Sequence, residues 1–399
     1  MRHRTRRIRH RPGPRPALIA AALAATLGFA LTAAAFAQPR AVQTLGIDTD
    51  IASIDVDAIL SGGPPPQGIP ALGFAGDAHG AVSASRDPRS VSAEFATNWL
   101  DDQEPVILIE VEDEARIYPL QILTWHEIAN DVVGGVPVAV TFCPLCNSAL
   151  AFDRRATVDD ETTTLTFGVS GMLLHSNMLM FDDTHRTLWV QLTGEAVVGA
   201  ATGARLERLA APIVSFEDAR SARPDADVLS RETGFVRSYG QNPYVGYDRA
   251  DSSPFLFAGD ADGRLLPKER VVTFELDGEP VAYPFTRLEE TRIVNDVVGG
   301  TPVAVVWSPG TRSALDGGSI AASRDVGAVN VFVRERDGRT VTLSPDGDDA
   351  FVDEATGDRY DLFGRALDDG DSFRFDSVPH DNTLWFAWAA FKPETEIRP

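Results

Sequence analysis

The only two cysteines of the chain, Cys143 and Cys146, stand three residues apart. They lie between two apolar, extended runs, residues 138–142 and 149–152, and the turn former Pro144 stands between the thiols. This pattern predicts a tight strand-to-strand turn that carries both sulfurs. Two thiols so placed can share a metal ion, close a disulfide or react with a redox partner, and the spacing leaves these alternatives open.

A histidine precedes the thiols by a distance that a single chain reversal can close. His126 lies on a predicted helix that begins at Pro119, and we expect Gly134 and Gly135 to end this helix and turn the chain back toward Cys143. The imidazole would then be a third metal ligand, or a base that keeps a cysteine as thiolate. The alternative is a histidine that only forms structural hydrogen bonds.

Further side chains could assist such a site. Met180 offers a thioether to copper(I), although methionines at strand spacing are commonly core residues, and His175 is a second accessory candidate. Glu127 and Asp131 stand four apart and would face one side of a helix, where they could serve acid/base chemistry or a cap.

The leading hypothesis is a soft-metal site built from Cys143, Cys146 and His126, with copper(I) ahead of zinc. A structural zinc site would require four ligands, and after removal of the signal the chain offers two cysteines and five histidines. A soft-metal site with three ligands fits this set of residues better. One alternative is an extracytoplasmic dithiol-disulfide oxidoreductase with Cys143 as the nucleophile. Another is a non-catalytic interaction module whose CxxC pair is a structural disulfide. Hydrolase chemistry is disfavoured, because the sequence around Ser170 lacks the glycine pattern of a nucleophile elbow.

An internal repeat organises the chain. The segment IANDVVGGVPVAV at 128–140 recurs as IVNDVVGGTPVAV at 293–305, an offset of 165 residues. We therefore predict two tandem repeat-related domains, 104–260 and 268–399, in an α+β fold with mostly antiparallel sheet. At the same offset the reactive positions differ while the frame is kept: Cys143 falls on Ser308, Cys146 on Thr311, His126 on Thr291 and Ser148 on Ser313. Function should lie in what differs.

Four segments together form a recognisable family pattern: 60–64 (LSGGP), 125–128 (WHEI), 141–150 (TFCPLCNSAL) and 385–388 (WFAW). They resemble the exported bacterial family called domain of unknown function 3179, over about residue 59 to the C-terminus. The resemblance implies family membership and no particular reaction. One departure is His175, where such proteins usually have a different polar residue, which puts a shared role for His175 in doubt.

The first 37 residues are typical of an export signal. Seven arginines precede an Ala/Leu-rich core, and Ala35-Phe36-Ala37 resembles a cleavage site. We expect an exported protein, periplasmic or extracellular, with no stable membrane insertion after cleavage; an N-terminal membrane anchor is the alternative. Residues 38–103 are expected to form a strap over the first domain.

Charge bears on the class of partner. The whole chain carries a formal net charge of −22, and removing the seven arginines leaves 29 basic against 58 acidic residues. So acidic a surface disfavours nucleic acid as a partner. The other partners and the substrate are not indicated by composition.

Overall fold

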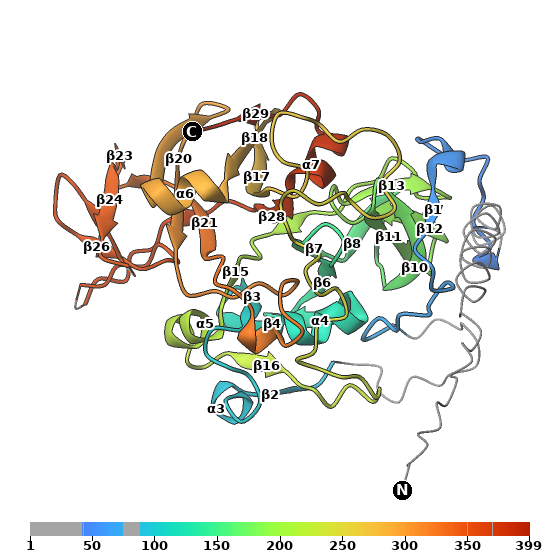
Figure 1. The fold of residues 1–399 in the computed structure, drawn as a ribbon, viewed down its shortest axis with the longest axis horizontal. Coiled ribbons are helices and arrows are strands. Elements are labelled where there is room, and N and C mark those ends of the chain that lie inside the picture. Colours follow the sequence, from blue (N-terminus) through green and yellow to red (C-terminus); the bar gives the residue numbers. More distant parts are fainter. Residues whose placement is uncertain (1–41, 43, 75–87, 349, 369) are drawn as a thin grey trace, which may run out of the picture.

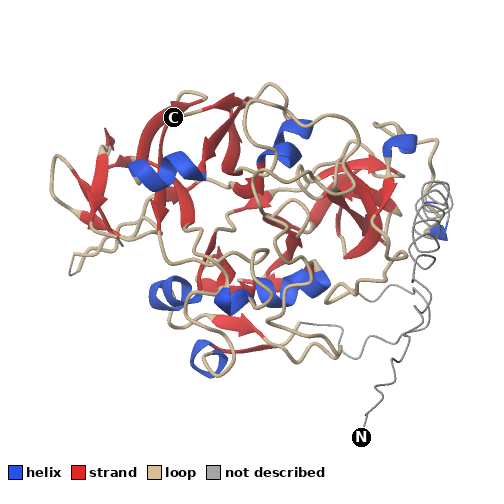
Figure 2. Ribbon diagram, viewed as in Figure 1, coloured by secondary structure: helices blue, strands red, loops and turns tan. Residues whose placement is uncertain are grey.

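The computed structural model describes residues 42, 44–74, 88–348, 350–368 and 370–399. Strands account for 41% of the residues and helices for 12%, so the chain is mostly β with many antiparallel sheets (Figure 2). This confirms the antiparallel part of the predicted fold class. The export signal predicted at 1–37 lies outside the described residues. Within the described ranges, no helix is long and apolar enough to cross a membrane.

The first half of the chain forms three larger sheets and one hairpin. The sheets, in spatial order, are β1 (Leu60–Ser61), β10 (Phe167–Leu174), β11 (Asn177–Asp182), β12 (Thr187–Val190) and β13 (Glu195–Val198); β14 (Arg208–Leu209), β7 (Ser148–Asp153), β6 (Val136–Cys143) and β5 (Ile128–Val133); β15 (Ile213–Ser215), β3 (Pro105–Val111), β4 (Glu114–Pro119), β16 (Asp227–Leu229) and β2 (Ser90–Ser92). The hairpin is β8 (Arg155–Val158) with β9 (Glu161–Thr164).

The second half forms two four-stranded sheets and two small ones. They are β28 (Asp381–Leu384), β17 (Arg270–Leu276), β18 (Glu279–Pro284) and β29 (Glu396–Ile397); β19 (Ile293–Val298), β20 (Thr301–Ser308), β21 (Ala328–Val333) and β27 (Asp376–Ser377); β22 (Glu335–Arg336) and β23 (Arg339–Thr340); β24 (Leu343–Asp346), β25 (Ala350–Asp353) and β26 (Arg359–Tyr360). The last sheet lies at the end of the molecule opposite β10–β13 (Figure 1).

The helices are short. They are η1 (Val56–Ala58), α3 (Ala93–Ala96), α4 (Leu120–His126), α5 (Phe216–Ala222), α6 (Phe285–Thr291), η2 (Ile320–Ala322) and α7 (Trp385–Phe391). Because helices this short cannot hold together alone, they depend on packing against the sheets.

The same strand orders occur in both halves. The order β15-β3-β4-β16 has its counterpart in β28-β17-β18-β29, and in each sheet the last pair is parallel while the other pairs are antiparallel. The order β7-β6-β5 likewise recurs as β21-β20-β19. A helix follows β4 and β18, and another follows β15 and β28.

Side-chain hydrogen bonds recur with the strand order. The amide of Asn130 accepts from the backbone N–H of Phe167 and donates to its carbonyl, both at 2.8 Å. Asn295 exchanges the same two bonds with Leu343, at 2.8 and 3.0 Å. Tyrosine hydroxyls also bond equivalent aspartates, Tyr118 to Asp131 at 2.9 Å and Tyr283 to Asp296 at 2.7 Å. The identical residues at these positions therefore form structural hydrogen bonds that both halves share.

The two halves nevertheless share hydrophobic cores. One core contains Phe167 and Trp189 of the first half together with Val271 and Trp385 of the second. A second core joins first-half residues such as Val106 to second-half residues around β19–β21. The halves are thus packed into each other through these two cores, while a further core around Phe274 and Val305 lies within the second half.

The described part of the lead-in lies along the first half. Strand β1 pairs with β10, and the backbone of Leu72 bonds both the carbonyl of Ile128 and the N–H of Asn130, at 2.8 and 2.9 Å. The N–H of Gln67 donates to the carbonyl of Val169 at 2.9 Å. These bonds place the segment 60–72 over the strands that surround the thiols.

The prediction that Gly134 and Gly135 end a helix was wrong. Helix α4 ends at His126, and the two glycines form the hairpin turn between β5 and β6. Their φ angles are +55° and +75°, a region that favours glycine. Residues 128–133 form a strand, and the short apolar segment before them gave no clear signal of where the helix ends.

The offset of 165 also fails beyond the thiol turn. In the first half Cys143 pairs with Ser148, whereas in the second half Ser308 pairs with Ala328. Ser313 therefore does not take the place of Ser148, because residues 309–327 form a longer excursion between β20 and β21. Thr311 lies in this excursion, so the tight turn that carries Cys146 has no direct copy.

The hairpin glycines provide a stability test. A Cβ on Gly134 would lie 2.3 Å from the carbonyl oxygen of Val111, whereas one on Gly135 would meet no atom within 4 Å. Gly135→Ala should therefore cost about 1 kcal/mol of backbone strain, and Gly134→Ala roughly 2 kcal/mol more. Urea unfolding of both variants measures the difference, and equal losses of stability would contradict this account of the turn.

Candidate functional site

The two cysteines occupy the turn between β6 and β7, as predicted. Cys143 ends β6, and the N–H of Cys146 donates to the carbonyl of Cys143 at 3.1 Å, which closes the turn. Asn147 follows with a φ of +51°, a conformation that asparagine tolerates better than most residues. The chain geometry therefore sets both sulfurs on the same short loop.

A strand from the second half holds this turn in place. The carbonyl of Cys146 accepts from the N–H of Leu384 and from the hydroxyl of Thr383, both at 2.9 Å. The amide of Asn147 donates to the carbonyl of Asn382 at 2.9 Å. These partners belong to β28, which lies beside β7 (Figure 1).

A buried carboxyl lies at the same contact. Asp381 accepts from the hydroxyl of Ser148 at 2.6 Å and from the N–H of Ala149 at 3.1 Å. Burial raises the pKa of Asp381 to about 7, although both hydrogen bonds favour the charged form. Strand β28 thus fixes the backbone on the far side of the cysteine turn.

The thiols are buried and face one carbonyl oxygen. Cys143 is 1% exposed and Cys146 is fully buried. Their sulfurs lie 3.8 and 3.5 Å from the carbonyl oxygen of Ser176, to which both S–H groups can donate, and the two thiols also bond each other. Burial and the neighbouring Cys143 raise the pKa of the Cys146 thiol well above its ordinary value. The Cys146 thiol is therefore protonated at neutral pH.

The accepting carbonyl belongs to the hairpin turn between β10 and β11. His175 and Ser176 have φ angles of +50° and +66°, as a two-residue turn of this kind requires. The Ser176 hydroxyl donates to the carbonyl of Phe255 at 2.5 Å, and the amide of Asn177 lies 3.6 Å from the sulfur of Cys146. Hydrogen bonds to Phe255 and to the sulfur of Cys146 thus hold this turn beside the thiols.

Cys143 also lines a small apolar cavity of about 100 Å³. Met172 and Met178 line the same cavity, as do Glu127 and Tyr244. Thiol and thioether sulfurs are soft donors, which favour soft metal ions such as copper(I). The cavity thus brings together one thiol, two thioethers and one carboxyl group.

Glu127 is the least expected member of the site. It caps α4 with a φ of +59°, is 8% exposed, and has no hydrogen-bond partner for its carboxylate among the described residues. Burial raises its pKa to about 8, so the group is largely a neutral acid at pH 7. Glu127 and Cys143 also contribute to raising the pKa of Tyr244, which burial raises most. The cavity is therefore close to uncharged.

The equivalent backbone of the second half carries different chemistry. Arg292 takes the place of Glu127, with a φ of +65°, and its guanidinium lies 4.9 Å from the ring centre of Trp307. Ser308, in the place of Cys143, donates to the carbonyl of Asp348 at 3.0 Å. One frame thus holds an acid beside a thiol, and the other holds a cation beside a hydroxyl.

His126 is occupied elsewhere. Its Nδ1 lies 2.7 Å from the carbonyl oxygen of Pro70 and its Nε2 lies 2.7 Å from the hydroxyl of Tyr239, while Phe235 packs against the ring. Burial lowers its pKa to about 4, so the imidazole is neutral. The described residues contain no group of three or more His, Cys, Asp or Glu side chains able to hold a metal ion. His126 therefore does not join the two thiols in such a group.

The two accessory candidates lie apart from the cavity lining. Met180 is fully buried on β11, paired with Val169 and Trp189, and is a core residue. His175 is half-buried, and its ring centre lies 5.4 Å from that of Phe391. The sequence favoured Met180 over Met172 and Met178, which stand near it in sequence, whereas these two line the cavity. Sequence reasoning named Glu127 without connecting it to the thiols, although its replacement by arginine in the second copy is visible in the sequence.

The buried acid predicts a pH dependence of stability. Because the pKa of Glu127 is raised from 4.5 to about 8, the folded chain retains a proton that the unfolded chain loses, so the free energy of unfolding falls as pH rises through this window. Glu127→Gln resembles the protonated acid and removes this loss. Its melting temperature should match that of the parent near pH 4 and exceed it by roughly 5 °C at pH 9.

Glu394→Gln is the control, because Glu394 is exposed. Scanning calorimetry of chelator-treated protein makes the comparison. If Glu127→Gln changes the melting temperature equally at pH 4 and pH 9, the carboxyl is not the buried acid described here.

Comparison with known proteins places the chain in a family without assigning it a reaction. No curated protein matches it, and no solved structure does. A family model described as a protein of unknown function, DUF3179, matches residues 66–395, which include the cysteine turn, β28 and all of the cavity lining except Gly62 and Pro64. The chain belongs to the DUF3179 family.

Proposed function

We propose that Cys143 and Cys146 bind one soft metal ion, with copper(I) ahead of zinc. A thioether of Met172 or Met178 completes the ligand set in place of the His126 imidazole. The observation that carries the proposal is that Cys143 and both methionines line one apolar cavity of about 100 Å³. Sulfur donors in apolar surroundings favour copper(I), whereas structural zinc requires four ligands in a tetrahedron.

Metal binding changes the charge of the site. The ion replaces the two thiol protons, which are released to solvent, and two thiolates remain around it. Copper(I) then gives a complex with one negative charge. Protonated Glu127 adds no second charge to this apolar cavity.

The second half of the chain is proposed to be scaffold. The recurring strand orders and the paired hydrogen bonds of Asn130 and Asn295 support two tandem repeat-related units. Only the first unit carries the thiols and Glu127. The second contributes β28, whose backbone holds the cysteine turn.

We propose an exported location, periplasmic or extracellular, on the basis of the arginine-rich and Ala/Leu-rich first 37 residues. An oxidising compartment would convert an exposed dithiol to a disulfide. Burial of Cys143 and Cys146 shields them from bulky oxidants. The large excess of acidic residues also argues against nucleic acid as a partner.

Anaerobic loading with copper(I) tests the ligand set. We expect one equivalent per chain for the parent protein, and less than about a tenth of an equivalent for the double substitution Cys143→Ser with Cys146→Thr. Met172→Leu or Met178→Leu should weaken binding about tenfold against a competing chelator. Met180→Leu is the matched control and should leave the affinity unchanged. A parent protein that holds no transition metal after loading would contradict the proposal.

A dithiol-disulfide oxidoreductase is the second candidate. The hydrogen bond between the thiols within one tight turn favours it, because the sulfurs need little movement to join. In that reaction the two thiols lose two protons and two electrons to a disulfide, which becomes two thiols. Burial of both sulfurs weighs against direct attack on a protein partner.

Redox titration of the metal-free protein separates the two candidates. An exchange catalyst should titrate reversibly between about −120 and −270 mV. A metal site does not require a reduction potential in this range, and we expect the potential of the Cys143–Cys146 pair to lie outside it. A reversible potential within the range, together with failure to bind copper(I), would favour the oxidoreductase.

A further inference from the structure

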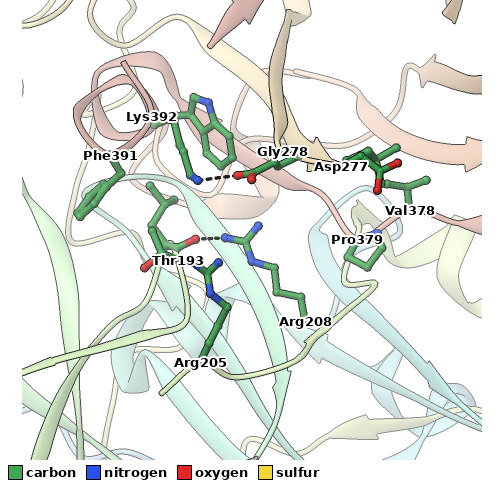
Figure 3. A pocket seen from close by; sticks show the side chains of 13 residues that line it. Thr193, Arg205, Arg208, Asp277, Gly278, Val378, Pro379, Phe391 and Lys392 are labelled. Carbon is green, nitrogen blue, oxygen red and sulfur yellow. Dashed lines mark hydrogen bonds and ion pairs between the residues drawn. The ribbon is translucent and has the colours of Figure 1, made fainter. Parts of the chain in front are cut away.

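A second cavity, of about 300 Å³, lies where the two halves of the chain meet. The first half contributes the segment around β13 and β14, and the second half contributes the β17–β18 hairpin and the end of α7 (Figure 3). It shares no lining residue with the thiol cavity. Any ligand it holds is therefore a separate question from metal binding.

Three cationic side chains point into this cavity: Arg205, Arg208 and Lys392 (Figure 3). Two of them have acidic partners. Arg205 forms an ion pair with Glu195, and Lys392 forms one with Glu275 at 2.5 Å.

Arg208 differs from its two neighbours. One guanidinium nitrogen donates to the carbonyl of Leu192, and the group forms no ion pair among the described residues. Burial lowers the pKa of Arg208, which means that the charge is held at a cost. The carboxylates of Asp381, Glu275 and Glu195 oppose this lowering of the pKa without forming an ion pair with Arg208, and its other N–H groups form no hydrogen bond among the described residues.

Apolar side chains make up part of the lining. They are Trp388 and Phe391 of α7 together with Leu276, Val378 and Pro379, and the carboxylates Glu275 and Asp277 also line the cavity. A cavity of this size that combines apolar side chains with polar groups is typical of small-molecule sites. A guanidinium recognises a carboxylate through two parallel hydrogen bonds.

We infer that this cavity binds a small organic carboxylate, with its anionic group on Arg208 and its hydrocarbon part against Trp388 and Phe391. Arg205 and Lys392 are already paired with Glu195 and Glu275, so Arg208 is the cation left to bind the anionic group. The chemistry selects a monocarboxylate with an aromatic or branched apolar body. Inorganic phosphate and acetate satisfy the charge without using the apolar side chains, so they should bind more weakly.

Calorimetric titration of the full chain with benzoate, acetate and inorganic phosphate tests the inference. We expect benzoate to bind with a dissociation constant below about 1 mM and at least tenfold more tightly than acetate or phosphate. Arg208→Gln should weaken benzoate binding about tenfold or more. Phe391→Ala should weaken benzoate binding and leave acetate unchanged.

Arg249→Gln is the matched control, because Arg249 forms an exposed surface pair with Asp251 and should bind benzoate as the parent does. If Arg208→Gln does not fold, Phe391→Ala decides the question. Benzoate binding that is absent in the parent, unchanged in Arg208→Gln, or unchanged in Phe391→Ala would overturn the inference. These outcomes do not depend on copper(I) loading, because the two cavities share no residue.

Discussion

Burial of the Cys143–Cys146 turn requires every polar group on it to find a partner inside the protein. An unpaired buried donor or acceptor costs about 1–3 kcal/mol, so a turn placed this deeply needs partners from elsewhere in the chain. Strand β28 bonds the carbonyl of Cys146 and the amide of Asn147, and the hairpin turn at Ser176 accepts from the sulfurs. The site is therefore assembled from segments more than 200 residues apart in sequence.

This constraint explains why a half without thiols is still needed. The second half supplies β28 and shares two hydrophobic cores with the first. Its own frame carries Arg292 and Ser308, with Arg292 stacked on Trp307 and bonded to Asp348. The same backbone thus supports a neutral, sulfur-lined cavity in one half and a surface ion pair in the other.

Local patterns in the sequence predicted much of the fold and part of the site. The extended runs around the cysteines predicted the β6–β7 turn. The end of α4 was missed because a strand-period pattern follows a seven-residue helix without an obvious break.

The cavity methionines were passed over in favour of Met180 for a different reason. Met172 follows a register shift between β10 and β11, and the Ser176 carbonyl, which accepts from the thiols, lies in the hairpin turn between these strands. Neither feature leaves a local pattern in the sequence. His126 looked like a ligand from its residue type, but Pro70 and Tyr239 take both of its nitrogens. Such pairings depend on contacts between distant segments, which spacing alone does not encode.

The most direct test of the central claim is X-ray absorption at the copper edge of the copper(I)-loaded protein. The account predicts sulfur-only scattering around the ion, from Cys143, Cys146 and a methionine of the cavity. It also predicts loss of one sulfur in whichever of Met172→Leu and Met178→Leu removes the thioether ligand. An imidazole scattering pattern would contradict the account, because it would require His126 to leave Pro70 and Tyr239 and join the thiols.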